Sequence, residues 1–182
     1  MVLEKNTVYP VRKCFAASRR DNLNFRKGAN MPHKFSNGIY TRSAEETISL
    51  GMKFSGTLTK KDVVVLEGAL GGGKTTFIKG VVKGLNIKAK VLSPSFTLVR
   101  QYGKAEFCLY HIDLYRLKED EIFNIGIEDF LYAKDAVTMI EWGEKIEDCI
   151  PSYIKIVFSL LDNNVRKIDF SLKGYKNRKI KL

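Results

Sequence analysis

"GALGGGKTT", residues 68–76, is the stretch of this sequence that decides its fold. It fits the pattern G-x-x-x-x-G-K-[ST], in which backbone N–H groups and one lysine bind a phosphate chain. Gly68, Gly73, Lys74 and Thr75 occupy the four defined positions of the pattern. A match of this length also arises by chance in glycine-rich loops, so the flanking sequence has to support it.

The flanking sequence predicts a strand before the loop and a helix after it. "DVVVLEG" (62–68) is a short, β-branched apolar run, which is typical of a buried strand. "KTTFIKGVVKGL" (74–85) has apolar residues at helical spacing, with a predicted inward face of Phe77, Ile78, Val81 and Val82. Strand, glycine loop and helix in this order argue against the alternative of a flexible surface loop.

The loop therefore predicts a site for a nucleoside triphosphate and magnesium. Glycines let N–H groups converge on phosphate oxygens, and the N-terminus of the helix adds a partial positive charge. Lys74 would reach the β- and γ-phosphates, and the Thr75 hydroxyl would bind Mg²⁺.

Two acidic residues end apolar runs downstream of the loop. Asp113 ends "FCLYHID" (107–113), and Glu141 ends "AVTMIE" (136–141). Magnesium takes oxygen ligands and hydrolysis requires a positioned water, so a carboxylate is expected at the C-terminal end of a neighbouring strand. We hypothesise that Glu141 binds the metal and that Asp113 positions water or supports the metal ligands. The alternative for each is a solvated acid at a strand end.

Other residues beside these motifs have two interpretations each. His111 lies two residues before Asp113, on the same face of a regular strand, and is either structural, the commoner case, or catalytic. Trp142 is either a core residue or a cover for the nucleotide or a partner surface. Three arginines could reach a γ-phosphate, with a surface salt bridge as the alternative for each: Arg100, Arg116 and Arg166.

The remaining segments alternate between helical and strand patterns. Ser43-Ala-Glu-Glu46 has the spacing of a capping box and predicts the start of a helix with an apolar face of Ala44, Thr47, Ile48, Leu50, Met52 and Leu58. "SFTLVRQYG" and "AEFCLYHIDLY" predict a hairpin that turns at Gly103-Lys104, and residues 117–135 predict two short helices broken at Gly126.

"YIKIVFSLLDNNVRKIDFSLKG" predicts two strands joined across Asp162-Asn163-Asn164. With the segments above, it predicts an α/β fold of the P-loop NTPase type, with three layers, a central mixed sheet and a C-terminal β-hairpin.

Composition and charge exclude several classes of protein. The chain has 182 residues, 45% of them hydrophobic, which is enough for one globular unit with a sizeable core. Residues 1–30 carry seven Lys or Arg against two acids, and residues 164–182 carry seven against one, so the two ends account for the whole net charge of +11. The segment between them is neutral, which argues against a basic DNA-binding surface.

Three widely separated cysteines and the lack of a long apolar run favour a soluble, cytoplasmic protein. We expect a basic arm at residues 1–30, either disordered or a start-site artefact if translation begins at Met31, with a transit peptide disfavoured by Glu4 and Asp21. A single P-loop ATPase domain would follow at residues 31–172. A basic tail would close the chain at 173–182, either solvated or in contact with tRNA phosphates.

Four motifs occur in order: "GALGGGKTT", "SPSFTLV" (93–99), "HIDLYR" (111–116) and "IEW" (140–142). Together they resemble the TsaE family, once called YjeE, the small ATPase of bacterial threonylcarbamoyladenosine tRNA modification. The resemblance runs from about Ser43 to about Pro151. It implies binding of ATP and Mg²⁺ and association with TsaB and TsaD, in which TsaD performs the transfer to adenosine 37 of tRNA and ATP hydrolysis supports turnover of the assembly.

The resemblance also assigns roles to individual residues. It implies Lys74, Asp113 and Glu141 as catalytic residues, and Thr75, Asp113 and Glu141 at the metal. The nucleotide contacts, to which Arg166 is added as a candidate cation, would be Thr47, Gly71, Gly72, Gly73, Lys74, Thr75, Thr76, Ser95, Trp142 and Arg166.

Three positions depart from the usual family pattern. The family usually has Asp at Ala69, Ala at Gly72 and Thr at Ser95. We expect Gly72 to loosen the loop and weaken nucleotide affinity, because glycine costs about 0.5–1 kcal/mol more than alanine to order.

Two other functions remain open from the sequence. A small-molecule P-loop kinase would use "DLYR" to hold an acceptor hydroxyl, but it would need an arginine-bearing lid where the sequence predicts a hairpin. A nucleotide-dependent binding module would hold ATP without significant turnover. No arginine finger is evident in the sequence, so the chain alone is expected to be a slow ATPase that depends on its partners.

Overall fold

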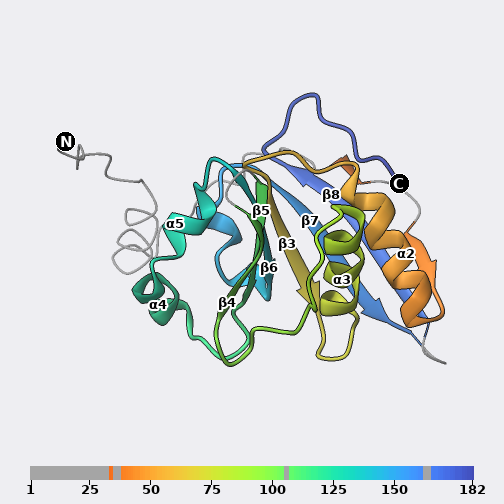
Figure 1. Cartoon of the computed structure of the whole chain (residues 1–182), viewed down its shortest axis with the longest axis horizontal. Coiled ribbons are helices and arrows are strands. Elements are labelled where there is room, and N and C mark those ends of the chain that lie inside the picture. The colour runs from red at the N-terminus through yellow and green to blue at the C-terminus, as the bar shows by residue number, and fades with distance from the viewer. Residues whose placement is uncertain (1–32, 35–37, 105–106, 162–164) are drawn as a thin grey trace, which may run out of the picture.

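The structure is a computed structural model that describes residues 33–34, 38–104, 107–161 and 165–182. The predicted arm at residues 1–30 lies outside the described residues. Figure 1 shows a twisted sheet with α2 and α3 on one face and α4 and α5 on the other. The strands follow the order β1-β8-β7-β3-β6-β5-β4, and β2 also pairs with β8. The predicted three-layer α/β fold with a mixed sheet is confirmed.

The centre of the sheet is parallel, and its edges are antiparallel. β3 pairs in parallel with β6 and β7, β5 pairs in parallel with β6, and β4 and β8 are antiparallel to their neighbours. The strand bounds are β1 His33–Lys34, β2 Ile39–Thr41, β3 Val63–Gly68, β4 Val99–Lys104, β5 Phe107–Asp113, β6 Ala136–Glu141, β7 Tyr153–Leu160 and β8 Arg166–Lys173. The predicted C-terminal hairpin is β7 and β8, although its turn at 162–164 lies outside the described residues.

This topology brings the predicted site residues to one edge of the sheet. Asp113 and Glu141 are register partners at the C-terminal ends of β5 and β6. β3 ends beside them at Gly68, where the phosphate loop begins, because Leu66 pairs with Glu141. In open α/β sheets, ligands bind at the C-terminal ends of parallel strands.

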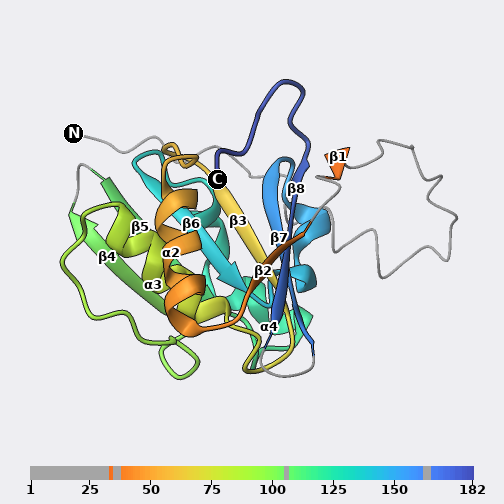
Figure 2. The ribbon, with the colours of Figure 1, turned by 90° about the vertical axis from the view of Figure 1, so that its right-hand side faces the viewer.

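The helices pack through two glycines. α2 (Ala44–Ser55) and α3 (Lys74–Gly84) approach so closely that a Cβ at Gly80 would overlap the Ile48 carbonyl oxygen, and one at Gly51 would overlap that of Phe77. Figure 2 shows the two helices side by side on their face of the sheet. Because the backbones of α2 and α3 touch at these glycines, this contact decides which face of α2 is buried.

The predicted apolar face of α2 is therefore partly wrong. Its buried residues are Thr47, Leu50, Gly51, Phe54 and Ser55. Met52 is 38% exposed, and Leu58 lies beyond the end of the helix. The predicted N-cap is confirmed, because Ser43 Oγ accepts the Glu46 N–H at 3.0 Å. Glu46 accepts the N–H of Arg42 at 2.7 Å, in place of the Ser43 N–H expected in a capping box.

Aromatic rings fill the core under α2 and α3. Phe77 lies 5.4 Å from Phe54, 5.7 Å from Phe158 and 6.1 Å from Phe170, measured between ring centroids. On the opposite face, the core is made by aliphatic residues of the sheet and the short helices: Val63, Val65, Ile112, Leu114, Ile122, Ile127, Leu131, Ile140 and Ile146. The predicted inward face of α3 is confirmed, because Phe77, Ile78, Val81 and Val82 are buried.

The predicted break at Gly126 is confirmed, but the predicted turn at Gly103-Lys104 is wrong. Gly126 has φ +68° and separates α4 (Glu119–Ile122) and the 3-10 helix Phe123–Ile125 from α5 (Ile127–Leu131). Gly103 and Lys104 belong to β4, opposite Cys108 and Phe107. A Cβ at Gly103 would lie 2.7 Å from the Phe107 carbonyl oxygen, so this glycine permits a close strand contact, which the sequence pattern does not separate from a turn.

The end of the chain packs against the domain. Arg178 forms an ion pair with both carboxylate oxygens of Asp62 and donates to the Thr57 carbonyl oxygen at 2.9 Å. Ile180 is buried in the core beneath α2 and α3. Solvated charge is thus the wrong interpretation for Arg178, because Asp62 is only 4% exposed and needs a cation. The tail boundary at residue 173 and its contact with tRNA stay predictions.

In the part of the chain that the structure describes, no helix combines the length and the apolar character that crossing a membrane requires.

We predict that Gly80→Ala lowers the free energy of unfolding by about 2 kcal/mol or more, because its methyl group would force α2 and α3 apart. Urea unfolding followed by circular dichroism measures the change. Gly56→Ala is the matched control, since its Cβ would meet only the Lys53 carbonyl oxygen, at 3.5 Å. Equal stability of the two variants would contradict the close contact.

We also predict that Arg178→Met lowers the free energy of unfolding by about 3–5 kcal/mol, because it leaves the Asp62 carboxylate buried without a cation. Lys179→Met, which removes an exposed charge from the same segment, should change it by less than about 0.5 kcal/mol. The same urea titration compares them, and a similar small loss in both variants would show that the tail is not part of the stable domain.

Candidate nucleotide-binding site

The phosphate loop runs directly from β3 into α3. Gly73 is the N-cap of α3 and has φ +103°, a conformation that residues with a Cβ rarely adopt. The Gly72 N–H donates to the Ala69 carbonyl oxygen at 3.0 Å and closes a tight turn. A Cβ at Gly72 would lie 2.9 Å from that same oxygen, so the alanine common in the family would require a shift here. The predicted effect of Gly72 on affinity stays a prediction.

Lys74 is held within the loop and is only 4% exposed. Its Nζ donates to the carbonyl oxygens of Gly68 at 2.6 Å and Ala69 at 3.0 Å, and it lies 4.3 Å from the ring centroid of Trp142. Burial lowers the pKa of Lys74, and the nearby carboxylates of Glu141, Glu144 and Asp113 oppose that shift. An ammonium group in such a desolvated position attracts phosphate oxygens more strongly than one in water.

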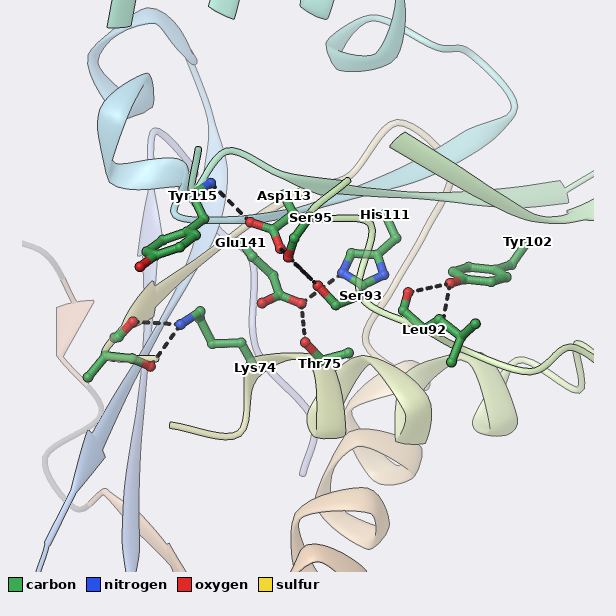
Figure 3. Close-up of polar contacts among 12 residues, drawn as sticks. Lys74, Thr75, Leu92, Ser93, Ser95, Tyr102, His111, Asp113, Tyr115 and Glu141 are labelled. Carbon is green, nitrogen blue, oxygen red and sulfur yellow. Dashed lines mark hydrogen bonds and ion pairs between the residues drawn. The ribbon is translucent and has the colours of Figure 1, made fainter. Parts of the chain in front are cut away.

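Thr75, Glu141 and His111 meet at one carboxylate oxygen. The Thr75 hydroxyl donates to Glu141 Oε1 at 2.6 Å, and His111 Nε2–H donates to the same oxygen at 2.8 Å. Figure 3 shows both contacts, with Thr75 on the first turn of α3. A hydroxyl and a carboxylate so close together are the pair that magnesium takes in P-loop proteins, with waters and phosphate oxygens as its other ligands.

His111 supports Glu141 from inside the protein. Its side chain is completely buried, and its Nδ1 has no hydrogen-bond partner among the described residues. Its ring lies 6.2 Å from that of Tyr102, between centroids. The structural interpretation of His111 therefore fits better than the catalytic one, because the contact is with Glu141 and no solvent reaches the ring.

Asp113 binds the segment that precedes β4. Its Oδ2 accepts the hydroxyls of Ser93, at 2.9 Å, and Ser95, while its Oδ1 accepts the Tyr115 N–H at 3.0 Å. The two serine hydroxyls also lie 2.7 Å apart (Figure 3). Ser95, a predicted nucleotide contact, thus reaches the second acid of the site.

A cavity of about 200 Å³ opens between these groups. Ten predicted site residues line it: Gly71, Gly72, Gly73, Lys74, Thr75, Thr76, Ser95, Asp113, Glu141 and Trp142. A larger groove of about 600 Å³ lies along the second half of α3, with Lys79, Lys83, Lys88 and Lys90 in its lining. No carboxylate lines that groove, and none of the predicted site residues does, so the smaller cavity is the candidate site.

Thr47 and Arg166 do not line this cavity, but approach Gly73 from another side. A Cβ at Gly73 would lie 3.2 Å from the Arg166 side chain and 3.8 Å from that of Thr47. The Thr47 hydroxyl is buried and bonded to Ser43 O at 3.0 Å and to the Thr41 hydroxyl at 2.9 Å. Their nucleotide contacts stay predictions.

The other two candidate arginines have different surroundings. The guanidinium carbon of Arg116 lies 4.1 Å from the ring centroid of Phe96. Arg100 has a buried Nε without a hydrogen-bond partner among the described residues.

Sequence reasoning missed Lys145 altogether, and it placed Ser93 and Tyr115 in family motifs without predicting a site role for either. Lys145 Nζ donates to the carbonyl oxygens of Leu114 at 2.7 Å, Tyr115 at 3.2 Å and Leu117 at 2.8 Å, which ties the loop after β5 to the loop after β6. The Tyr115 ring lies 5.0 Å from that of Trp142. Contacts to carbonyl oxygens require no particular residue type, so no sequence signal pointed to Lys145.

The described residues contain no group of three or more His, Cys, Asp or Glu side chains that could bind a metal by themselves. Magnesium commonly takes one or two carboxylates and completes its shell with phosphate oxygens and water. Thr75, Glu141 and Asp113 offer one hydroxyl and two carboxylates at the same edge of the sheet.

Comparison with known proteins agrees with this geometry. Residues 41–168 match the family described as "Threonylcarbamoyl adenosine biosynthesis protein TsaE". A Nostoc relative named "tRNA threonylcarbamoyladenosine biosynthesis protein TsaE" is 35% identical over 136 residues, which is 73% of this chain and 84% of the relative. A relative of the same name from Treponema pallidum is 39% identical over 130 residues, which is 70% of this chain and 95% of the relative.

A solved structure shows the same fold. The crystal structure of YdiB from Bacillus subtilis superposes with a TM-score of 0.67 and 30% sequence identity, over 80% of this chain and 90% of YdiB. The resemblance predicted from the four motifs is thus confirmed by overall sequence and by fold, and the chain belongs to the TsaE family.

Proposed function

We propose that this protein is a Mg²⁺-dependent ATP-binding and ATP-hydrolysing subunit that supports formation of N6-threonylcarbamoyladenosine at position 37 of tRNA, together with TsaB and TsaD. The names of its relatives support the pathway. The single observation that carries the nucleotide chemistry is the contact of Thr75 and Glu141 beside a buried Lys74.

In this proposal the loop binds the phosphates through its N–H groups and the N-terminus of α3. Lys74 would exchange its two carbonyl partners for phosphate oxygens, which are stronger acceptors because they are charged. Mg²⁺, when bound, would neutralise charge on the phosphates. Thr75 and Glu141 would hold it, and His111 would keep the Glu141 carboxylate oriented.

Asp113 would position the attacking water or the shell around the metal. The Tyr115 N–H donates to Oδ1 of Asp113 and so fixes the orientation of the carboxylate, whose remaining lone pairs would accept a hydrogen bond from that water. Trp142 would cover Lys74 and the phosphates, and the remaining contacts would come from Gly71, Gly72, Gly73, Thr76 and Ser95, with Thr47 and Arg166 on the other side of the loop.

The site favours slow turnover by the isolated chain. No arginine lines the described cavity, and Arg116 is stacked on Phe96. P-loop proteins that lack a catalytic group supplied by a partner turn over at about 10⁻⁴ to 10⁻² per second. We therefore propose that partners complete or organise the site.

A small-molecule kinase would need an arginine-bearing lid in the part of the chain that follows Pro151. That part of the chain forms the β7–β8 hairpin, which disfavours the small-molecule kinase.

Steady-state ATP hydrolysis, with and without a TsaB–TsaD pair from the same organism, tests the proposal. We expect turnover below about 10⁻² per second alone, and stimulation by the pair that disappears in Lys74→Ala. Turnover of several per second by the chain alone would contradict partner dependence. Phosphate transfer to an added small acceptor would favour the kinase, and ATP binding without any hydrolysis would favour the binding module.

The effect of Mg²⁺ on ATP binding should distinguish the role of Glu141 from that of Asp113. Glu141→Gln removes a metal ligand, so Mg²⁺ should no longer strengthen ATP binding, whereas Asp113→Asn should keep that dependence and lower stimulated turnover by about 10²-fold or more. Fluorescence of Trp142, the only tryptophan in the sequence, reports binding because its ring covers Lys74. The opposite pattern would reverse the two roles.

A further inference from the structure

The groove of about 600 Å³ along the second half of α3 lies outside the candidate site. α3 leads away from the phosphate loop, and the chain then returns beside it to begin β4 at the edge of the sheet that carries the site (Figure 1). We call residues 86–92, which form the second wall of the groove, the return segment. Apolar residues of both walls line the groove together with four exposed lysines: Val82, Ile87, Val91, Lys79, Lys83, Lys88 and Lys90.

Hydrogen bonds hold the return segment in place at both ends. The Tyr102 hydroxyl, from β4, accepts the Leu92 N–H at 3.3 Å and donates to the Leu92 carbonyl oxygen at 3.1 Å. At the other end, the Ile87 N–H donates to the Val82 carbonyl oxygen at 3.1 Å, and the Ile87 side chain packs against the core. The groove is thus formed before any ligand binds, which lowers the entropy that binding costs.

The part of the sequence that forms the groove is strongly basic, although the segment between the two ends of the chain is neutral on average. Residues 68–105 contain seven Lys or Arg and no Asp or Glu, whereas residues 106–150 contain twelve Asp or Glu against four Lys or Arg. The acidic stretch includes α4 and α5, on the opposite face of the sheet from α3 (Figure 1). Among the described residues that line the groove there is no carboxylate to balance the four lysines.

We infer that this groove binds the phosphate backbone of RNA, with its four lysines in contact with phosphates. Lys79 and Lys83 lie one helical turn apart, with Cβ atoms about 5–6 Å from each other, and Lys88 and Lys90 lie two residues apart on the facing wall. Lysine contacts phosphate as a compact point charge on a flexible stem, so two such pairs can follow a chain of phosphates. That the RNA is tRNA rests on the proposed function; the affinity for phosphates rests on the groove itself.

The composition of the groove argues against other occupants. Arginine and aromatic residues are enriched in protein interfaces and lysine is depleted there, but the described lining of the groove has four lysines and neither an arginine nor an aromatic residue. Residues 1–30 of this chain carry an excess of positive charge, so the lysines would repel them. Single-stranded RNA stacks its bases on aromatic side chains, so contact with the backbone of a folded RNA fits the groove better.

The groove is separate from the candidate nucleotide site. The two cavities share no lining residue, because the groove ends at Leu92 and the site begins at Ser93 on this side. RNA in the groove and ATP in the site can therefore be bound at the same time. Substitution of groove lysines should change RNA binding and leave ATP binding as it is.

Binding of a labelled tRNA transcript to the full chain, measured by fluorescence anisotropy over a range of salt concentrations, tests the inference. Each lysine–phosphate contact contributes about 0.7–0.9 to the slope of log K against log salt concentration. The double variant Lys83→Gln/Lys88→Gln, with one lysine from each wall, should therefore reduce that slope by about 1.5–2 and weaken binding by about tenfold or more at about 0.1 M salt.

Lys118→Gln/Lys134→Gln is the matched control, because it removes the same charge from two exposed lysines beside α4 and α5. It should bind tRNA within about threefold of the unaltered chain, since these lysines do not line the groove. Both double variants should keep their ATP affinity, measured by Trp142 fluorescence, and their thermal unfolding midpoint.

Each outcome separates the groove from the proposed function. Equal loss of tRNA binding in the two double variants, or no loss in either, would overturn the inference. If the unaltered chain does not bind tRNA but the TsaB–TsaD pair stimulates its ATP hydrolysis, the inference fails and the proposed function stands. If tRNA binding depends on the groove but the pair gives no stimulation, the groove binds RNA and the proposed function fails. A groove variant that keeps tRNA binding but loses stimulation by the pair would assign the groove to an acidic protein and would also overturn the inference.

Discussion

The hydrogen bond from Thr75 to Glu141 joins the phosphate loop to the strand that carries the acid, two parts of the chain that are 66 residues apart. It depends on the parallel register of β3 and β6, in which Leu66 lies opposite Glu141. A slip of one residue in that register would turn the Glu141 side chain to the opposite face of the sheet. The two core strands are buried almost completely, and this burial fixes the register on which the site depends.

Around this bond, three further loops are tied to one another by polar contacts. Lys145 links the loop after β6 to the loop after β5, and Asp113 links the loop after β5 to the turn that carries Phe96. Tyr115 and Trp142 stack between them, over Lys74. Figure 3 shows the part of this network in which Asp113 accepts from Ser93, Ser95 and Tyr115.

The remainder of the domain supports this edge of the sheet through the packing of α2, α3 and the end of the chain. Gly51 and Gly80 let α2 approach α3 closely, and the aromatic core beneath them holds α3 against the sheet. Arg178 and Ile180 bring the end of the chain against the residues before β3, where Asp62 and Thr57 receive them. The Arg178 ion pair and the chemistry of the site therefore lie at opposite ends of β3, whereas the aromatic core extends to the loop end, where Phe158 pairs with Gly68.

The sequence by itself determined the strand, loop and helix around Gly68–Thr76, the two acids at strand ends, the C-terminal hairpin and the family. These features are local: the loop pattern sets backbone chemistry over nine residues, and an apolar run ending in an acid places that acid at the edge of a parallel sheet. Tertiary structure decided the buried face of α2, the place of Gly103 inside β4, the inward ion pair of Arg178 and the contact of His111 with Glu141. Periodicity predicts which residues of a helix or strand share a face, but not which other element that face will contact. Lys145 and Lys74 bind carbonyl oxygens, and every residue has a carbonyl oxygen. Such contacts therefore leave no pattern in the sequence.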